Sequence, residues 1–277
     1  MSAVGFCFCY TTRMNSDSFK IIKKLNSTVE TQDTPEPTNP ESTDTQSKVV
    51  ALTFDDGPNP YATPQILDIL KSENVKATFF LIGKWVEKYP ELARRIVSEG
   101  HTIGGHTFTH GDTSGIEDDG KIDGAEIDGG EKYPSLSTWG DFKKGNDTIR
   151  EITGVDVRQV RVPQFGYNTI DTIDTIDGKK VARIQELTEG SLAEDVSSGK
   201  LLVIDRSINP NDWCVLVPEF FIKKYVLTQL HPGAIICLHD GSENESELAT
   251  RARRTMRVLP EVIRGIREKG YSFETKF

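Results

Sequence analysis

Short apolar runs alternate with amphipathic stretches along the chain from residue 48 onward. Apolar runs of this length, bounded by polar and glycine-containing turns, are typical of buried strands. The pattern therefore predicts seven strands. They cover residues 49–54, 77–82, 101–105, 159–162, 201–204, 234–238 and 271–275.

Two stretches between the predicted strands carry apolar residues at helical spacing, so that each set lies on one helix face. Gly100 and Gly270 follow these stretches and act as C-terminal stops. Strand and helix in repeated alternation predict an α/β fold with parallel strands and crossover helices, either a barrel or a doubly wound sheet. The two sets are Trp85, Tyr89, Leu92 and Ile96, and Leu259, Val262, Ile263 and Ile266.

Residues 1–47 are predicted to form a disordered tail or linker. Residues 26–48 are rich in Thr, Ser, Pro, Asp and Glu and offer almost nothing to bury. Stalks of this kind often hold domains off a cell surface, which suggests an extracellular or envelope location, while a plain disordered tail explains the same composition. Residues 3–10 are mildly apolar but have no basic residue before them, so they give no clear signal peptide.

The overall composition limits the function further. The 277 residues are 36% hydrophobic and 27% charged, which is typical of a globular protein, and the formal net charge of -9 argues against nucleic-acid binding. No apolar stretch reaches the ~20 residues that a membrane-spanning helix needs, so we expect no membrane span. Cys7, Cys9, Cys214 and Cys237 show no CxxC pairing and indicate neither a zinc ribbon nor a disulfide framework.

One long segment interrupts the alternation of strands and helices. Residues 111–140 are acidic and rich in glycine, which predicts a surface loop near the mouth of the domain. The spacing of its aspartates resembles that of calcium loops, but the glutamate expected at loop position twelve is missing. We therefore favour a solvated loop over a calcium site.

Two adjacent carboxylates, Asp55 and Asp56, follow the first predicted strand and precede a Gly-Pro turn. Neighbouring acids repel each other, so they persist at a strand end mainly where a cation neutralises one or a reaction uses the other. A solvated turn is the alternative explanation, because Asp, Gly and Pro are common turn residues. The choice between the two depends on residues further along the chain.

Two histidines, His106 and His110, follow the third predicted strand at a spacing that would put both imidazoles on one side of a helical turn. Arg161, the segment 209–213 and His239 also follow predicted strands, as the two carboxylates do. The C-terminal ends of parallel strands converge on one face of an α/β fold. We therefore infer a single shared site.

One carboxylate and two imidazoles form a ligand set that leaves a divalent ion an open position for water or substrate. Mixed nitrogen and oxygen ligands favour zinc, with cobalt or another transition ion possible, over magnesium or calcium. The ion would activate a water and polarise a carbonyl oxygen. The second carboxylate would be the general base and a distant histidine the acid, which predicts metal-assisted hydrolysis of an amide or ester.

Five motifs in order along the chain resemble those of the polysaccharide deacetylases, the NodB-like enzymes of carbohydrate esterase family 4. The resemblance covers about residues 48–277, which it identifies as a catalytic domain. It implies a distorted (β/α) barrel of about seven parallel strands and a metal-dependent deacetylase that acts on N-acetyl or O-acetyl groups of a polysaccharide. The motifs are residues 53–58 (TFDDGP), 106–110 (HTFTH), 161–166 (RVPQFG), 212–213 (DW) and 238–240 (LHD).

The resemblance implies a role for each matched residue of the reaction centre. Asp56, His106 and His110 would be the metal ligands. Asp55 would be the base, and His239 would be the acid that protonates the leaving group.

Further matched residues would support the base and the substrate. Arg161 would hold Asp55 ionised through a salt bridge, because an opposite charge lowers the pKa of a carboxyl group. Trp213 and Leu238 would form the walls of a small apolar pocket for the acetyl methyl group.

The chain departs from the family pattern in three places. One extra residue lies between Pro163 and Gly166, so that Gln164 or Phe165 would supply the backbone donor to the oxyanion. Asn209 stands at the position that we align with the aspartate that orients the catalytic histidine, and an amide cannot stabilise an imidazolium by charge. The loops at 111–140 and 167–199 are longer than expected.

These residues lead to one main functional hypothesis and two alternatives. The main hypothesis is a hydrolase that releases acetate from an N-acetylglucosamine polymer such as peptidoglycan, chitin or a related glycan. An esterase for O-acetyl groups, for instance on xylan, is the first alternative, which Asn209 mildly favours because an alkoxide leaving group needs the acid less. The second is a carbohydrate-binding protein that kept the pocket and lost activity.

Overall fold

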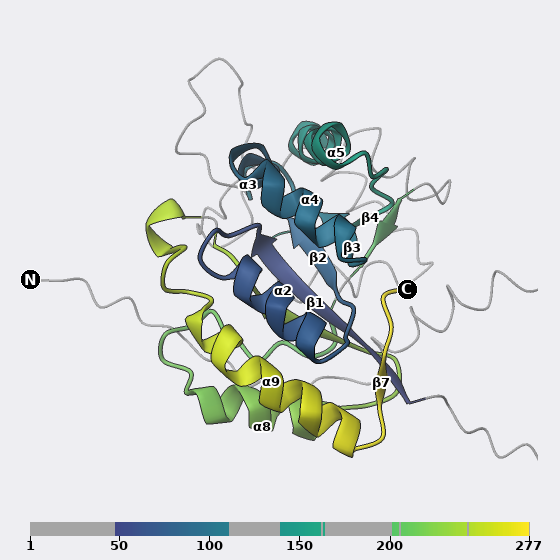
Figure 1. Ribbon diagram of the computed structural model, residues 1–277, viewed down its shortest axis with the longest axis vertical. Coiled ribbons are helices and arrows are strands. Elements are labelled where there is room, and N and C mark those ends of the chain that lie inside the picture. The colour runs from purple at the N-terminus through teal and green to yellow at the C-terminus, as the bar shows by residue number, and fades with distance from the viewer. Residues whose placement is uncertain are drawn as a thin grey trace, which may run out of the picture.

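The computed structural model describes residues 48–110, 139–161, 163, 201–204, 206–242 and 244–276 of the 277-residue chain. In these residues, strands and helices alternate along the sequence (Figure 1). The predicted tail, residues 1–47, lies outside the described residues, as does most of the predicted loop 111–140. The last two residues of that loop, 139 and 140, belong to a helix instead.

All seven predicted strands are confirmed within the described residues, with ends that differ by a few positions. Every pairing between them is parallel. The sheet order is β5-β4-β3-β2-β1-β6, and β7 pairs with the first residues of β1. The strands are β1 (Val49–Gly57), β2 (Thr78–Leu81), β3 (Thr102–Gly105), β4 (Gln159–Val160), β5 (Leu202–Val203), β6 (Ala234–His239) and β7 (Ser272–Phe273).

Helices connect the strands and cover the sheet in two groups (Figure 1). The helices α3, α4 and α5 contact one another, and α4 and α5 also contact β3, whereas α8 and α9 pack against each other and α2 contacts α9. Their bounds are α2 (Thr63–Ser72), α3 (Gly83–Lys88), α4 (Pro90–Ser98), α5 (Trp139–Thr153), α8 (Glu219–Gln229) and α9 (Arg253–Glu268), with a 3-10 turn η2 at Glu245–Glu247.

The first predicted helix is in fact two helices. The chain leaves helical geometry at Tyr89, which has φ -128° and ψ 58°, and Pro90 starts α4. A proline disfavours the helical conformation of the residue before it, and it lacks the N–H that would continue the ladder. The prediction that these residues share one helix face was therefore wrong. It rested on the spacing of the apolar residues and did not allow for the helix break at Pro90.

The second predicted helix is confirmed as α9. Its residues Leu259, Val262, Ile263 and Ile266 are all fully buried. Gly270 follows α9 with φ 81°, and Gly100 follows α4 with φ 78°. Both glycines are in the left-handed conformation that ends a helix, as predicted.

Strand β1 separates two packing environments because successive side chains point to opposite faces. Val50, Leu52 and Phe54 belong to the main hydrophobic core. Ala51 lies on the other face, in a smaller cluster with Phe80 and two isoleucines. The second face also carries Thr53 and Asp55, and it leads to the functional site described below.

The segment after β5 crosses to the other edge of the sheet. The N–H of Ser207 donates to the carbonyl of Ile235 at 3.0 Å, and Ile208 forms a parallel bridge with Ile236 of β6. The chain that leaves one edge strand therefore runs beside the other edge strand. The predicted α/β fold with parallel strands is confirmed.

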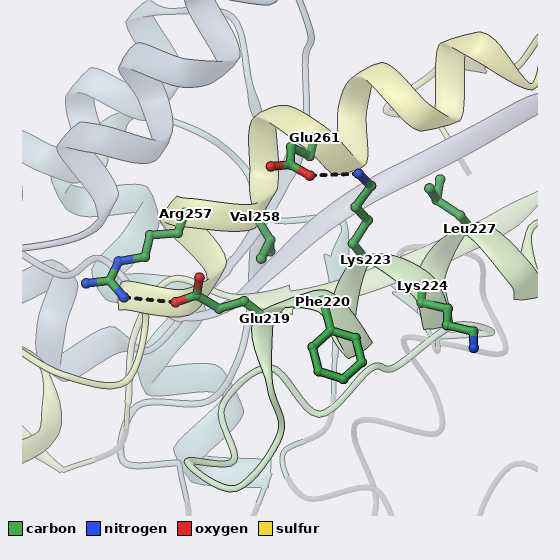
Figure 2. Close-up of a pocket in the computed structure, with 8 residues that line it drawn as sticks. All are labelled: Glu219, Phe220, Lys223, Lys224, Leu227, Arg257, Val258 and Glu261. Carbon is green, nitrogen blue, oxygen red and sulfur yellow. Dashed lines mark hydrogen bonds and ion pairs between the residues drawn. The ribbon is translucent and has the colours of Figure 1, made fainter.

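The pair α8 and α9 borders a pocket that lies apart from the strand ends (Figure 2). Two ion pairs join the helices there, Glu219 with Arg257 at 2.9 Å and Lys223 with Glu261 at 2.7 Å. None of the predicted site residues lines this pocket. Among the described helices, none is both long enough and apolar enough to cross a membrane.

Candidate metal centre and catalytic groups

The paired carboxylates lie where β1 loses its regular alternation. The pairing of β1 with β2 shifts register between Asp55 and Gly57, and Asp56 has φ 73°. A positive φ is unusual for a residue with a side chain, and such residues cluster at functional sites. Both side chains are buried, with exposed fractions of 2% for Asp55 and 5% for Asp56.

A close approach of two backbones fixes this turn. A Cβ atom on Gly241 would lie 1.9 Å from the carbonyl oxygen of Asp56, and a Cβ atom on Gly57 would lie 2.3 Å from Oδ2 of Asp240. Both distances are shorter than a real Cβ atom allows, and at Gly241 the obstructing atom belongs to the backbone, so that position requires glycine. The segment after β6 is thereby pressed against the turn after β1.

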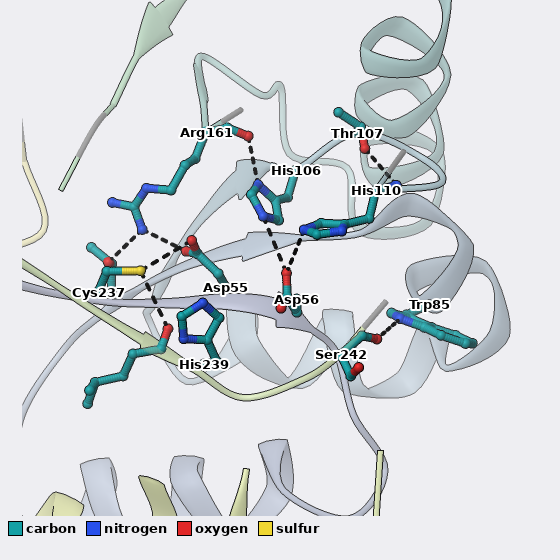
Figure 3. Close-up of polar contacts among 12 residues, drawn as sticks. Asp55, Asp56, Trp85, His106, Thr107, His110, Arg161, Cys237, His239 and Ser242 are labelled. Carbon is teal, nitrogen blue, oxygen red and sulfur yellow. Dashed lines mark hydrogen bonds and ion pairs between the residues drawn. The ribbon is translucent and has the colours of Figure 1, made fainter. Parts of the chain in front are cut away.

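The structure brings Asp56, His106 and His110 together at the C-terminal edge of the sheet (Figure 3). Oδ1 of Asp56 lies 3.3 Å from Nε2 of His106 and 3.1 Å from Nε2 of His110. All three side chains are buried. They are the carboxylate and the two imidazoles that the sequence singled out.

The contacts of these three side chains suit a cation. Nδ1 of His106 lies 2.7 Å from the carbonyl oxygen of Arg161, which can only accept, so Nδ1 carries a hydrogen and Nε2 is the ring nitrogen that faces Asp56. Oδ1 of Asp56 is buried, and among the described residues it accepts no hydrogen bond. Burial alone would raise the pKa of Asp56, but His110 and His106 outweigh it and hold that pKa well below its usual value. One carboxylate oxygen and two imidazole nitrogens that converge in this way fit the ligand set of a divalent ion.

The histidines reach Asp56 from an irregular loop and not from the predicted helical turn. Thr107 has φ 65° and His110 has φ 62°, both in the left-handed region. Oγ1 of Thr107 accepts a hydrogen bond from the N–H of His110 at 2.9 Å, which stabilises the turn. The two imidazole rings still lie together, with centroids 4.9 Å apart. The spacing thus identified the pair of histidines, but the helical geometry was wrong.

Asp55 forms a buried ion pair with Arg161. Nη1 of Arg161 donates to Oδ1 of Asp55 at 2.6 Å and also to Oγ1 of Thr53 at 2.8 Å. Burial alone would raise the pKa of Asp55, but the guanidinium group outweighs it, and the pKa lies below its usual value. Asp55 is therefore ionised at neutral pH, as a base must be.

Arg161 itself is fully buried at the end of β4. Its Nε donates to the carbonyl of Ile204 at 3.2 Å, and its guanidinium carbon lies 4.1 Å from the centre of the Phe80 ring. A buried guanidinium needs such partners on every side. The same residue also holds His106 through its carbonyl oxygen, so that it contacts both the predicted base and a predicted metal ligand.

His239 at the end of β6 is oriented by Asp212. Nδ1 of His239 lies 2.8 Å from Oδ1 of Asp212, and the N–H of His239 donates to Oδ2 at 2.9 Å. Oδ2 also accepts from the hydroxyl of Thr255. Burial alone would lower the pKa of His239, but the charge of Asp212 outweighs it and raises the pKa to about 9. An imidazolium with this pKa can donate a proton from Nε2 at neutral pH.

The alignment of Asn209 with the orienting aspartate was therefore wrong. Oδ1 of Asn209 accepts the N–H of Asn211 at 3.1 Å, which is an Asx turn, and Asn211 has φ 55°. This turn brings Asp212 to His239 instead. The sequence did contain the signal, because Asp212 precedes Trp213 in a recognised motif and is the only carboxylate in segment 209–213.

The residues predicted to line the acetyl pocket lie in different places. Leu238 is fully buried in the main core beside Phe54, on the face of β6 opposite to His239, so its prediction as a pocket residue was wrong. Side chains two apart share a face of a strand, which puts Cys237 next to the site instead. Trp213 is partly buried against the main core. Phe165 lies outside the described residues.

Comparison with known proteins finds relatives over most of the chain. The sequence model of the family described as polysaccharide deacetylase matches residues 42–174. A chitooligosaccharide deacetylase of Bradyrhizobium sp. (strain ANU 289) is 33% identical over 230 residues, which cover 81% of this chain and 87% of the relative. A peptidoglycan-N-acetylglucosamine deacetylase of Bacillus cereus is 28% identical over 234 residues, which cover 82% and 86%.

Solved structures share the fold as well. The polysaccharide deacetylase Bc1974 from Bacillus cereus superposes with a TM-score of 0.57 and 28% sequence identity, over 83% of this chain and 92% of that chain. The parallel sheet, the order of the motifs and the identity with the Bradyrhizobium protein over most of both chains lead to one conclusion: this chain belongs to the polysaccharide deacetylase family.

Proposed function

We propose that the protein is a metal-dependent N-deacetylase that releases acetate from N-acetylglucosamine units of a polysaccharide such as peptidoglycan, chitin or a related glycan. The observation that carries this proposal is the convergence of three groups at one sheet edge. These are the cluster of Asp56 with two histidines, the Asp55 carboxylate paired with Arg161, and the His239 imidazole paired with an aspartate.

Asp56, His106 and His110 would hold the cation. When bound, such an ion supplies Lewis-acid polarisation of the acetyl carbonyl and lowers the pKa of a water molecule that it binds. We propose zinc, because one carboxylate oxygen and two imidazole nitrogens suit it better than magnesium or calcium, with cobalt as a functional substitute.

The remaining groups of the chain move the protons. Asp55 would accept a proton from the attacking water through Oδ2, since Oδ1 is held by Arg161. His239 would donate the proton on Nε2 to the leaving amine, since its Nδ1 faces Asp212. Arg161 and Asp212 would act as positioning residues, because each fixes the orientation and the charge of its partner.

The experiment that tests this proposal is metal removal and reconstitution. We expect the chelated protein to release no acetate and to recover activity with added zinc or cobalt, on chitooligosaccharides, peptidoglycan or both. Acetylxylan is assayed in parallel, and release from acetylxylan alone would identify an esterase. Bound metal without acetate release from any of these substrates would overturn the enzymatic proposal and favour a carbohydrate-binding protein.

The O-acetyl alternative has lost its main argument. It rested on Asn209 as a weak partner of the catalytic histidine, whereas the carboxylate of Asp212 stands beside His239. A strongly basic amine leaving group needs a competent acid, and the pKa of His239, about 9, supplies one.

We further propose that residues 48–277 form the catalytic domain and that residues 1–47 are a flexible linker that leads to it. An extracellular or cell-envelope location would follow from a peptidoglycan or chitin substrate. Limited proteolysis tests the boundary: cleavage before residue 48 should leave a fragment that keeps its zinc and its activity, and loss of both on such cleavage would contradict it.

A further inference from the structure

A thiol next to the proposed base has no role in the reaction described above. Cys237 lies on β6, two residues before His239, and is fully buried. Its Sγ lies 3.3 Å from Oδ2 of Asp55, the carboxylate oxygen that Arg161 does not hold. Figure 3 shows that the sulfur and the guanidinium group both face this carboxylate.

Three different metal-ligating atoms converge at this point. The sulfur of Cys237, a carboxylate oxygen of Asp55 and a ring nitrogen of His239 lie within 4.8 Å of one another. Nδ1 of His239 faces Asp212, which leaves Nε2 as the nitrogen that can bind a cation. This set shares no residue with the cluster of Asp56, His106 and His110.

The separation of the sulfur and the carboxylate oxygen suits two ligands of a tetrahedral ion. Bonds of about 2.3 Å to sulfur and about 2.0 Å to oxygen place those two ligand atoms roughly 3.5 Å apart at the tetrahedral angle. The observed separation of Sγ and Oδ2 is 3.3 Å. Thiolate is the ligand that soft and borderline cations prefer, whereas magnesium and calcium avoid it.

We propose that Asp55, Cys237 and His239 form a second, inhibitory site for a thiophilic divalent cation, Cd²⁺ or a second Zn²⁺. Binding forms metal bonds to Sγ, to a carboxylate oxygen and to Nε2, and it releases to water the thiol proton of Cys237 and any proton on Nε2 of His239. The ion occupies the proposed base and the proposed acid together. The cation is therefore required at the first site and inhibits at the second.

The binding part of this proposal is independent of the deacetylase reaction, and only the inhibition rests on the proposed function. Binding is therefore measured directly. A cadmium–thiolate bond gives an ultraviolet charge-transfer band, and exchange of cadmium into the Asp56 cluster gives none, because that cluster contains no sulfur. The band thus distinguishes the two sites.

The test uses the full chain with one equivalent of zinc and the substitutions C7S, C9S and C214S. Since the sequence holds four cysteines, only Cys237 remains. Titration with Cd²⁺ should give the thiolate band with one further equivalent bound, and acetate release should fall in parallel. This variant keeps Cys237, so the absence of the band from its spectrum would by itself overturn the proposal.

The matched comparison adds C237S to the same chain. Loss of an outer-shell partner costs about 10–100-fold in metal affinity, so loss of a direct ligand should weaken the second cadmium by about 100-fold or more. We expect the band to vanish and the inhibition, relative to the variant's own activity, to need correspondingly more Cd²⁺. Unchanged affinity for the second equivalent would overturn the site, and C237A repeats the comparison if C237S does not fold. Tight binding with the band but without inhibition would keep the site and contradict the reaction roles of Asp55 and His239.

Discussion

Two adjacent aspartates have different partners, and their substitutions should therefore differ. Asp56 faces the two histidines, whereas Asp55 faces Arg161. We expect Asp56→Ala to lose the metal, and Asp55→Asn to keep it while turnover falls by about 100-fold or more, the usual contribution of a general base. Metal content after dialysis and kcat separate the two effects. Equal metal loss in both variants would contradict the assigned roles.

The contact between Asp212 and His239 predicts a pH effect. His239 must be protonated to donate, so activity should persist below its pKa, about 9, and fall as the pH rises through it. Asp212→Asn removes the charge that raises this pKa, so the alkaline limb of the kcat profile should move to lower pH, and kcat should fall roughly 100-fold or more.

Asn209→Ser is the matched control for this measurement. The serine hydroxyl can keep the turn that Asn209 stabilises, and Asn209 has no contact with His239 among those of the described residues. The alkaline limb should therefore stay in place. If Asn209→Ser moved the limb as far as Asp212→Asn does, Asp212 would not be the residue that sets the pKa of His239.

At the residue scale, the sequence predicted which types of side chain meet, but not always which position along the chain supplies them. The acidic and imidazole side chains of the site were recognised because each follows a predicted strand. They are Asp55, Asp56, His106, His110 and His239. Asp212 was missed because an Asx turn with a left-handed residue decides which side chain reaches His239. Leu238 was predicted as a pocket residue in place of Cys237 because it is adjacent to His239 in the sequence. Residues two apart share a face of a strand, so Cys237 is the residue on the same face as His239.

At the scale of elements, the start of α2 is tied to the segment after β6. The hydroxyl of Thr63, the first residue of α2, donates to Oδ2 of Asp240 at 2.5 Å and accepts the N–H of Asn59 at 2.7 Å. Thr63 and Asp240 are fully buried. The helix that follows the Asp55-Asp56 turn is thus fixed to the strand that carries His239.

This contact predicts a difference between two threonine substitutions. Thr63→Val leaves a buried carboxyl and a buried N–H without their partner and should lower the free energy of unfolding by about 1–3 kcal/mol. Thr78→Val on β2 is the control, because the buried Oγ1 of Thr78 has no hydrogen-bond partner among the described residues, so its loss should be neutral or slightly stabilising. Urea unfolding of the zinc-loaded variants measures both. A greater loss for Thr78→Val would contradict this explanation.

Element types were easier to predict than their local breaks. Apolar runs identified all seven strands because a buried parallel strand needs an almost continuous apolar sequence. The break at Tyr89 and the left-handed residues of the 106–110 loop were missed, because periodicity records which faces are apolar and not where the backbone departs from a helix. The position of the site at the strand ends was nevertheless predictable from the parallel topology.

At the scale of the whole molecule, the proposed metal joins separate parts of the sheet. Asp56 comes from the C-terminal end of β1, and the two histidines come from the loop after β3. An ion that binds only the folded chain stabilises it by about 2.7 kcal/mol when the free ion is at 100 times its Kd. We therefore expect Tm to rise with free zinc and to fall with a chelator.

Asp56→Ala provides the control for this linkage. Its Tm should lie near that of the chelated parent and should respond little to zinc, because one of the three ligands is gone. Calorimetry of both chains across a zinc series tests this. An equal rise of Tm in Asp56→Ala would mean that zinc stabilises the protein at another site.

Arg161 holds its two partners through chemically different parts of one residue. The carbonyl oxygen that fixes His106 is present in every amino acid, whereas the guanidinium that fixes Asp55 is not. We therefore expect a single substitution at this position to abolish the proposed turnover and to leave the proposed cation affinity largely intact. One substitution would then be enough to convert the proposed hydrolase into a carbohydrate-binding protein that keeps all three of its proposed metal ligands.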